Sequence, residues 1–249
     1  MSAPVDHGVR VPDLAEGPAP GWPVVLRFGR VRPGAGPGDR DLSPDGFGRA
    51  LDAVLHVFEP ADPCVLMADH DLMRCTRPAA LFTFDHGYRD QVEYAVPRLE
   101  ERGVNALFFV CTGTLAAHPD RAHGDWLDWD TCRDLRGAGH ILGSHGIGPS
   151  ADPAAEPAET RRQVIRSLHD LRFHVDVRRG LYAYPDGIVT PVPHHVPQLG
   201  ALLAFGAEST PAQPWTDAPL AIRRTYLPAR EPERWPALVG GWRERWDQG

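Results

Sequence analysis

The sequence contains no lysine, because all 26 basic residues among its 249 are arginine. This absence excludes Schiff-base and pyridoxal-phosphate chemistry, which needs an amine nucleophile. It also excludes the phosphate-loop and kinase designs, which place a lysine on the nucleotide phosphates. Glycine and proline are abundant instead, with 25 and 26 residues, as is usual in proteins from GC-rich genomes. We therefore interpret the missing lysine as a compositional bias that limits the mechanism without indicating a function.

Other classes are excluded by features that the chain has little of. A formal charge of −7 argues against nucleic-acid binding, which normally requires a basic face. No apolar run is long enough to span a membrane, and the first residues lack the charged and apolar segments of a secretory signal. The four cysteines form no CxxC pair, which predicts buried, reduced thiols. We expect a cytoplasmic protein that binds neither nucleic acid nor membrane; nothing in the sequence sets its oligomeric state.

The order of the predicted elements indicates an α/β fold. Residues 1–22 are rich in proline, glycine and acidic groups and predict a flexible N-terminal arm, followed by a single domain over 23–249. Within that domain, short apolar runs alternate with amphipathic segments, as in parallel sheets and barrels. The predicted strands are 23–31, 79–84, 105–112, 140–145 and 202–208, and the predicted helices are 43–58, 89–102, 126–139 and 159–175. The C-terminal segment predicts an amphipathic helix that packs by its tryptophans, Trp235, Trp242 and Trp246.

Polar residues stand at three places where the chain leaves an apolar segment. Asp85 and His86 follow 79–84, His145 ends 140–145, and Asp186 lies in the segment YAYPDG. Functional groups of α/β barrels collect where strands end. A carboxylate beside one histidine, with a second histidine from another strand, can bind a metal ion or transfer protons. Taken alone, such an aspartate is more often a loop cap than a catalyst, and such a histidine more often only makes a hydrogen bond.

Taken together, these segments resemble the polysaccharide deacetylase family, in its NodB-homology form (carbohydrate esterase family 4). The resemblance runs from about residue 23 to about residue 210. It includes FTFDHGYRD where the family has TFDDGY, then YAVPRLEERGVNALFFV, WLDWDTCRDLRGAGHILGSH, and YAYPDG where the family has AYPYG. It implies an irregular (β/α)7-type barrel of the NodB kind. It also implies an amide hydrolase that removes an acetyl group from an N-acetylated sugar.

The resemblance assigns roles to the residues after the strands. Asp85 takes the position of the general base that acts on water. His86 replaces the family's metal-binding aspartate, and His145 takes the position of the first metal-binding histidine. Arg224, or its neighbour Arg223, is similar to a late arginine that pairs with the base, and such a pair would lower the pKa of Asp85.

The metal site departs from the family pattern. The second metal-binding histidine of the family falls at Pro149, whose side chain has no donor atom. A catalytic zinc site normally has three protein ligands. The resemblance therefore implies a divalent metal, such as zinc, only if a third ligand joins His86 and His145. Asp85, Asp152 and His123 are the candidates, and catalysis by Asp85 and His145 without metal is the alternative.

Four further residues are candidates for substrate binding. They are Tyr88, Trp126, Tyr184 and Asp186. Trp126 is suited to stacking on a sugar face, although packing in an amphipathic turn explains it as well. The backbone N–H at Asp186 takes the position of the family's oxyanion donor, and its carboxylate could bind a cationic or hydroxyl-rich group or cap the turn before Gly187.

The leading hypothesis is a carbon–nitrogen hydrolase that deacetylates a small N-acylated, sugar-like metabolite. One alternative is a catalytically inactive barrel that binds a carbohydrate or a protein, which the loss at Pro149 favours. Another is a metal-independent hydrolase or lyase that acts on a non-sugar substrate. For the hydrolase, we expect Asp85→Asn to abolish turnover and leave folding intact.

Overall fold

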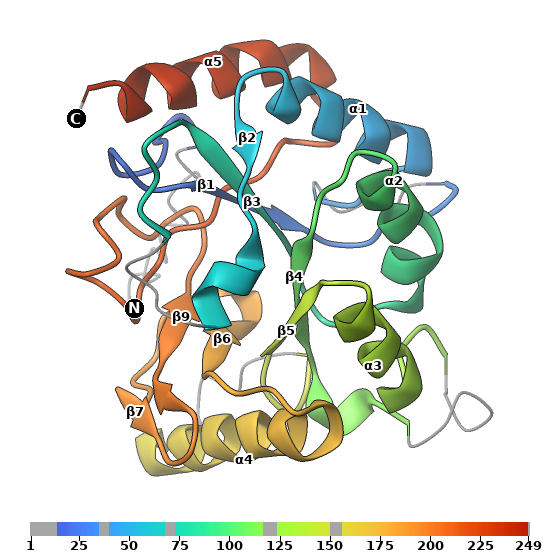
Figure 1. The fold of residues 1–249 in the computed structure, drawn as a ribbon, viewed down its shortest axis with the longest axis vertical. Helices are drawn as coiled ribbons and strands as arrows, with labels where there is room; N and C mark the ends of the chain where they lie inside the picture. Colours follow the sequence, from blue (N-terminus) through green and yellow to red (C-terminus); the bar gives the residue numbers. More distant parts are fainter. Residues whose placement is uncertain (1–13, 35–39, 68–72, 117–123, 150–155, 249) are drawn as a thin grey trace, which may run out of the picture.

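The computed structural model describes residues 14–34, 40–67, 73–116, 124–149 and 156–248, and shows a curled parallel sheet with helices outside it (Figure 1). Neighbouring strands are β1 (Val24–Phe28), β3 (Ala79–Phe84), β4 (Ala106–Val110), β5 (Ile141–Ser144), β6 (Leu181–Ala183) and β9 (Leu203–Phe205), in that order. The short β2 (Glu59–Pro60) pairs with β3 and makes the sheet seven-stranded. The predicted irregular barrel is confirmed.

The segment 222–225 closes the circle between the two edges of the sheet. Ile222 exchanges backbone hydrogen bonds with β9, and Thr225 does the same with β1. The residues between them therefore lie where the first and last strands meet. This placement decides the environment of Arg224, which is fully buried.

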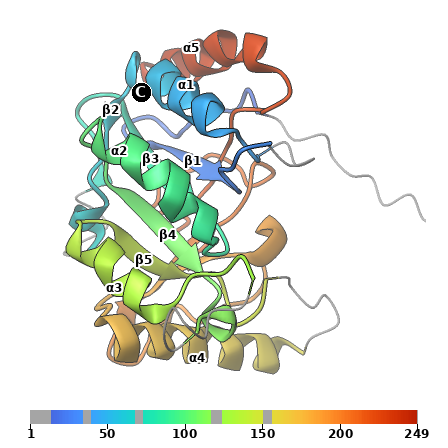
Figure 2. The same ribbon diagram turned by 90° about the vertical axis from the view of Figure 1, so that its right-hand side faces the viewer.

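The helices cover the outer face of the sheet, as the side view in Figure 2 also shows. They are α1 (Pro44–Leu55), α2 (Val96–Glu100), α3 (Trp129–Gly137), α4 (Pro157–Val175) and α5 (Trp235–Trp246). Single turns lie at η1 (Pro63–Met67), η4 (Thr112–Thr114), η6 (Pro185–Gly187) and η7 (Pro232–Arg234), and β7 (His195–Val196) and β8 (Gly200–Ala201) form a small hairpin. No helix in these described ranges is long and apolar enough to cross a bilayer.

The helix predicted over 89–102 differs from a regular α-helix. Its first part is a π-helical turn, η3 (Gln91–Ala95), and only the second part, α2, is α-helical. Pro97 explains the change, because it lacks an N–H and its ring would clash with the carbonyl four residues earlier. The wider turn removes that conflict.

Alternation along the strands separates two cores. Leu81, Leu107, Phe109 and Phe205 belong to a cluster inside the barrel, whereas Phe84 and its outward-facing neighbours pack against the helices. Because side chains alternate with a period of two, Arg27 lies on the inner face with Val25, and Thr83 and Asp85 lie on the inner face with Leu81. The inner core thus ends in polar residues at the carboxyl ends of the strands.

Part of the predicted N-terminal arm is packed on the domain. Leu14, Ala19 and Trp22 are buried. The indole N–H of Trp242 in α5 donates to the carbonyl of Leu14 at 2.7 Å, and Trp22 stacks on Trp215 at 5.3 Å. The arm prediction is therefore wrong for 14–22, because these apolar side chains have hydrophobic partners, and 1–13 lie outside the described residues. The predicted packing of the C-terminal helix by its tryptophans is confirmed for Trp235 and Trp242, which are buried.

Candidate active site

Asp85 is held by two arginines at the carboxyl end of β3. Nη1 and Nη2 of Arg224 donate to its two carboxylate oxygens at 2.5 and 3.0 Å, a bidentate arrangement. Nε of Arg27, on the neighbouring strand β1, lies 3.6 Å from Oδ2. All three side chains are less than a tenth exposed. Arg223, the alternative partner considered above, instead donates to the backbone carbonyls of Glu16 and Thr210.

Arg224 keeps Asp85 ionised. Burial by itself would raise the pKa of this carboxyl, but the charge and hydrogen bonds of Arg224 hold the pKa below its ordinary value. Arg224 is itself fixed by donating to the carbonyl of Gly206 at 2.9 Å. The carboxylate is therefore anionic at neutral pH and rigidly oriented.

His145 follows β5 and presents one free ring nitrogen. Its Nδ1 lies 3.0 Å from the carbonyl oxygen of Ala183, which can only accept a hydrogen bond. Burial lowers the pKa of His145 to about 4, so the ring is neutral at pH 7. The proton of the neutral ring must then be on Nδ1, and Nε2 carries a lone pair. Nε2 is buried and has no hydrogen-bond partner, so it can accept a proton or bind a metal.

His86 lies against His145. Their ring centroids are 4.6 Å apart, with the planes nearly perpendicular. The backbone of His86 has a φ of +75°, a conformation that few non-glycine residues adopt and that often marks a functional site. Its Nδ1 is buried without a partner, and burial lowers its pKa. The site thus contains two neutral imidazoles with unpaired nitrogens.

The described side chains do not fit a catalytic metal site with three protein ligands. His86 and His145 offer two nitrogens, whereas the carboxylate of Asp85 is engaged by arginines and Pro149 has no donor. No group of three histidine, cysteine, aspartate or glutamate side chains within the described ranges could hold a metal ion. Asp152 and His123, the other candidates for a third ligand, lie outside those ranges.

These residues surround a cavity of about 160 Å³ at the carboxyl ends of the strands. Its lining includes the predicted residues Asp85, His86, His145, Tyr88 and Asp186, together with Arg27. Trp126 does not line the cavity but stacks on Tyr88 at 4.9 Å between ring centroids. The structure thus brings together the predicted catalytic residues with Tyr88 and Asp186.

Tyr184 lies away from this cavity. Its ring is buried in a separate cluster, and its hydroxyl donates to the carbonyl of Leu220 at 2.9 Å. Alternation explains this, because Ala183 faces the inside of the barrel and the next side chain must face the outside. The structure therefore gives Tyr184 a packing role instead of the predicted contact with substrate.

Replacement of Tyr184 tests this reassignment. Tyr184→Phe removes one buried hydrogen bond and leaves the carbonyl of Leu220 unpaired, so we expect the free energy of unfolding to fall by about 1 kcal/mol. Urea unfolding measures this change. A substrate-binding role would instead raise KM in steady-state kinetics at unchanged stability.

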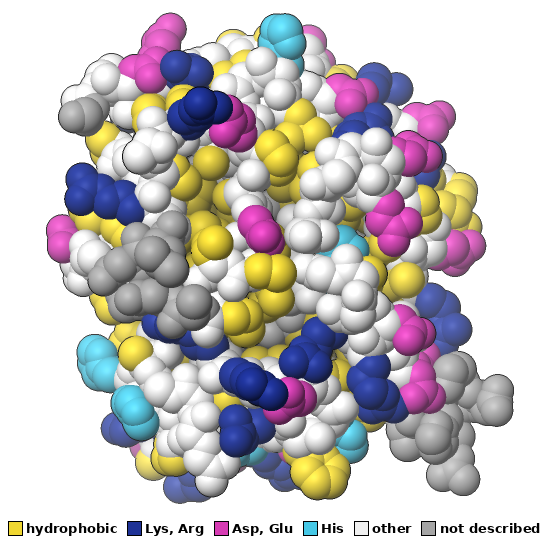
Figure 3. All heavy atoms as spheres, viewed as in Figure 1, with side chains coloured by type: hydrophobic (Ala, Val, Ile, Leu, Met, Phe, Trp, Pro, Cys, Tyr) yellow, Lys and Arg dark blue, Asp and Glu magenta, His cyan; other side chains and the backbone are white. Residues whose placement is uncertain are grey.

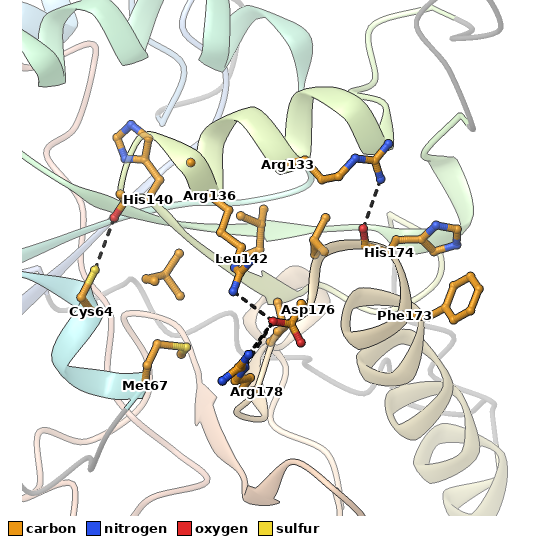
Figure 4. A pocket seen from close by; sticks show the side chains of 15 residues that line it. Cys64, Met67, Arg133, Arg136, His140, Leu142, Phe173, His174, Asp176 and Arg178 are labelled. Carbon is orange, nitrogen blue, oxygen red and sulfur yellow. Dashed lines mark hydrogen bonds and ion pairs between the residues drawn. The ribbon is translucent and has the colours of Figure 1, made fainter.

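A larger cavity lies at the other end of the barrel, and none of the predicted site residues lines it. Its volume is about 730 Å³, and Figure 4 shows it between the start of β5, η1 and the ends of α3 and α4. Arg136 and Arg178 point to Asp176, and Arg133 donates to the carbonyl of His174. Basic side chains gather on this face of the molecule above α4 (Figure 3). Its lining also includes His140 and His174. Its arginines are paired and none of the predicted site residues lines it, so we place the candidate active site in the cavity at Asp85.

The sequence interpretation missed Arg27. The signal is an arginine in the middle of the apolar strand VVLRF, on the same face as the inward-pointing Val25. A charged residue at an inward position is rarely buried unless it is paired. Its partner here is Asp85, which comes from the adjacent strand.

Comparison with known proteins agrees with this fold and these motifs. The sequence model of the polysaccharide deacetylase family matches residues 74–196, which contain both the Asp85–His86 and the His145 segments. The chain belongs to this family, whose members are carbohydrate deacetylases that generally depend on a metal ion. No curated protein sequence matches the chain.

Solved structures show the same fold at low sequence identity. IcaB from Ammonifex degensii is 20% identical with a TM-score of 0.68, over 92% of this chain and 99% of that one. The Streptococcus pyogenes deacetylase PplD, solved in complex with acetate, is 15% identical with a TM-score of 0.71, over 89% and 99%. The deacetylase domain of BpsB from Bordetella bronchiseptica is 19% identical with a TM-score of 0.57, over 84% and 97%.

Proposed function

We propose that this protein hydrolyses the amide bond of a small, N-acetylated, sugar-like metabolite. One observation carries the proposal: Asp85, His86 and His145, from two different strand ends, meet in one cavity with an ionised carboxylate and an unpaired imidazole nitrogen. This is the combination that activates water for attack on a carbonyl carbon. The family relationship supports the same reaction class.

In the proposed mechanism, Asp85 and His145 divide the activation of water. The lone pair on Nε2 of His145 accepts one hydrogen bond from the water and orients it. Asp85 accepts the other proton as the water oxygen bonds to the carbonyl carbon, and the carbonyl electron pair moves onto its oxygen. When that pair returns, the carbon–nitrogen bond breaks, and Asp85 gives its proton to the leaving nitrogen. The products are a free amine and acetic acid, which releases its proton to the solvent and becomes acetate at neutral pH.

The low pKa of Asp85 favours protonation of the leaving nitrogen more than it favours the removal of a proton from water. A carboxylate held by Arg224 is a weak base toward water, but its protonated form is a strong acid toward an amine. The charge of Asp85 also favours the protonated form of His145, so the pair can share the proton. Each proton transfer in this scheme is made by Asp85 or His145, so the scheme does not depend on the missing third metal ligand.

The cavity limits which part of the substrate can enter. A volume of about 160 Å³ is below the usual range for a whole ligand and accommodates an acetamido group. The sugar ring would then lie at the mouth near Tyr88, whose ring is contacted by Trp126 and by the guanidinium of Arg30 at 4.5 Å. The carboxylate of Asp186 would bind a hydroxyl or an amine of the substrate.

Release of acetate tests the proposal. Purified protein is incubated with N-acetylated monosaccharides and with N-acetylated oligosaccharides, with a chelator or with added zinc, and acetate and free amine are quantified. We expect equal amounts of both products, more from the monosaccharides, and activity that resists the chelator. Binding without release of acetate under every condition would overturn the hydrolase and favour a binding module.

A further inference from the structure

The guanidinium of Arg27 has one buried nitrogen without a partner. Its side chain is 6% exposed, and Nε faces Asp85, but Nη1 makes no hydrogen bond. A buried donor left unpaired is costly, and more so when it is charged. Such groups are rare in folded proteins. A ligand that accepts a hydrogen bond from Nη1 would remove this cost.

The position of Nη1 indicates what that ligand is. Arg27 starts on β1 and extends past Asp85 to the turn at 185–187, where a Cβ on Gly187 would lie 3.0 Å from Nη1. This turn follows β6 and contains the backbone N–H of Asp186, the expected oxyanion donor. Arg27 is one of the residues that line the cavity, and its Nη1 lies next to this turn at the cavity's edge.

We infer that Arg27 is a catalytic residue whose Nη1 donates to the substrate's carbonyl oxygen as it becomes an oxyanion. The inference rests on the proposed function, because it concerns the same amide carbonyl. Arg27 would also supply positive charge at the carbonyl oxygen. A metal ion could make the same contribution, but the described residues do not provide three protein ligands for one. Fixed donors directed at developing charge are among the largest contributions to catalysis.

Gly187 is part of the arrangement. Its φ is +71°, and any side chain there would meet Ala207 as well as Arg27. The missing side chain leaves room for the guanidinium beside the turn. Arg40 also lines the cavity, but its guanidinium lies over the ring of Tyr226, at 5.7 Å, and not at Asp85. Arg40 therefore provides a matched control for charge without the local donor.

Kinetics of Arg27→Met and Arg27→Lys test the inference. Because Asp85 keeps its bidentate contact with Arg224, we expect both variants to fold, which circular dichroism checks. For Arg27→Met we expect kcat to fall about 10²–10³-fold with little change in KM, since the donor acts mainly on the oxyanion. Arg27→Lys keeps the charge but cannot contact Asp85 and the turn together, so it should recover only part of kcat.

Binding of methylphosphonate, a tetrahedral anion that resembles the intermediate, gives a readout independent of turnover. By calorimetry we expect Arg27→Met to weaken its affinity at least tenfold, and Arg40→Met to weaken it much less. If the wild type turns over and Arg27→Met keeps both its kcat and its affinity for methylphosphonate, the inference about Arg27 is overturned but the proposed function is not. A wild type without turnover whose methylphosphonate affinity depends on Arg27 overturns the amide hydrolase and keeps the anion donor. If the wild type has no turnover and its methylphosphonate affinity does not depend on Arg27, the proposed function and the inference about Arg27 are both overturned.

Discussion

Asp85→Asn is expected to lose both activity and stability. Loss of the base should lower kcat by about 10²–10⁴-fold. The same change removes the negative charge that faces Arg224, a side chain with no exposed surface. An uncompensated buried charge costs about 3–5 kcal/mol, so the free energy of unfolding should fall by that amount. The sequence alone led us to expect that this variant folds normally, whereas the buried ion pair leads us to expect a less stable protein.

A double variant separates the two effects. Asp85→Asn combined with Arg224→Met removes both charges of the buried pair, so it should be more stable than Asp85→Asn alone. It should remain inactive, because the base is still missing. Urea unfolding and acetate release measure the two properties on the same samples.

An exposed bidentate pair serves as the control. Arg102 donates to the two carboxylate oxygens of Asp52 at 2.8 and 3.2 Å, but the side chain of Asp52 is 63% exposed. Asp52→Asn should change stability by less than about 1 kcal/mol and leave turnover unchanged. If Asp85→Asn were as stable and as active as this control, both the buried pair and the base would be assigned wrongly.

The elements that the sequence predicted well are those with local causes. The apolar run over 79–84 coincides with β3, and Ser43 caps α1 by accepting from the N–H of Gly46. The convergence of Asp85, His86 and His145 was also predictable, because parallel strands end at one side of the sheet. These inferences need only the order of elements and the residues at their ends.

The rest depends on strand parity and on contacts distant in sequence. Tyr184 and Ala183 are neighbours, and only the register of β6 decides that Ala183 faces inward. Arg224 reaches Asp85 because 222–225 closes the sheet beside β1, across 139 residues of sequence. Arg27 has no motif around it, so only its inward position in β1 identifies it.

Acid pH should destabilise the folded protein through His145. The ring is buried beside Asp85, His86 and Arg224, and burial lowers its folded pKa from 6.5 to about 4. Between these two values the unfolded chain binds a proton that the folded protein does not, so stability increases with pH. The contribution of the neutral His145 to stability is fully present above pH 6.5 and is lost as the pH falls toward 4. The shift corresponds to about 3 kcal/mol.

Urea unfolding between pH 7.5 and pH 4 measures this loss, because this range spans the pKa values of His145 in the unfolded and the folded protein. Burial also lowers the pKa of His86 and of His140, so both contribute in the same direction. His145→Gln removes the largest contribution and should flatten the dependence, whereas His56→Gln, at an exposed position after α1, should leave it unchanged. An equally steep dependence in His145→Gln would show that this histidine is already protonated or exposed in the folded protein. The lone pair on Nε2 that the proposed reaction requires would then be absent.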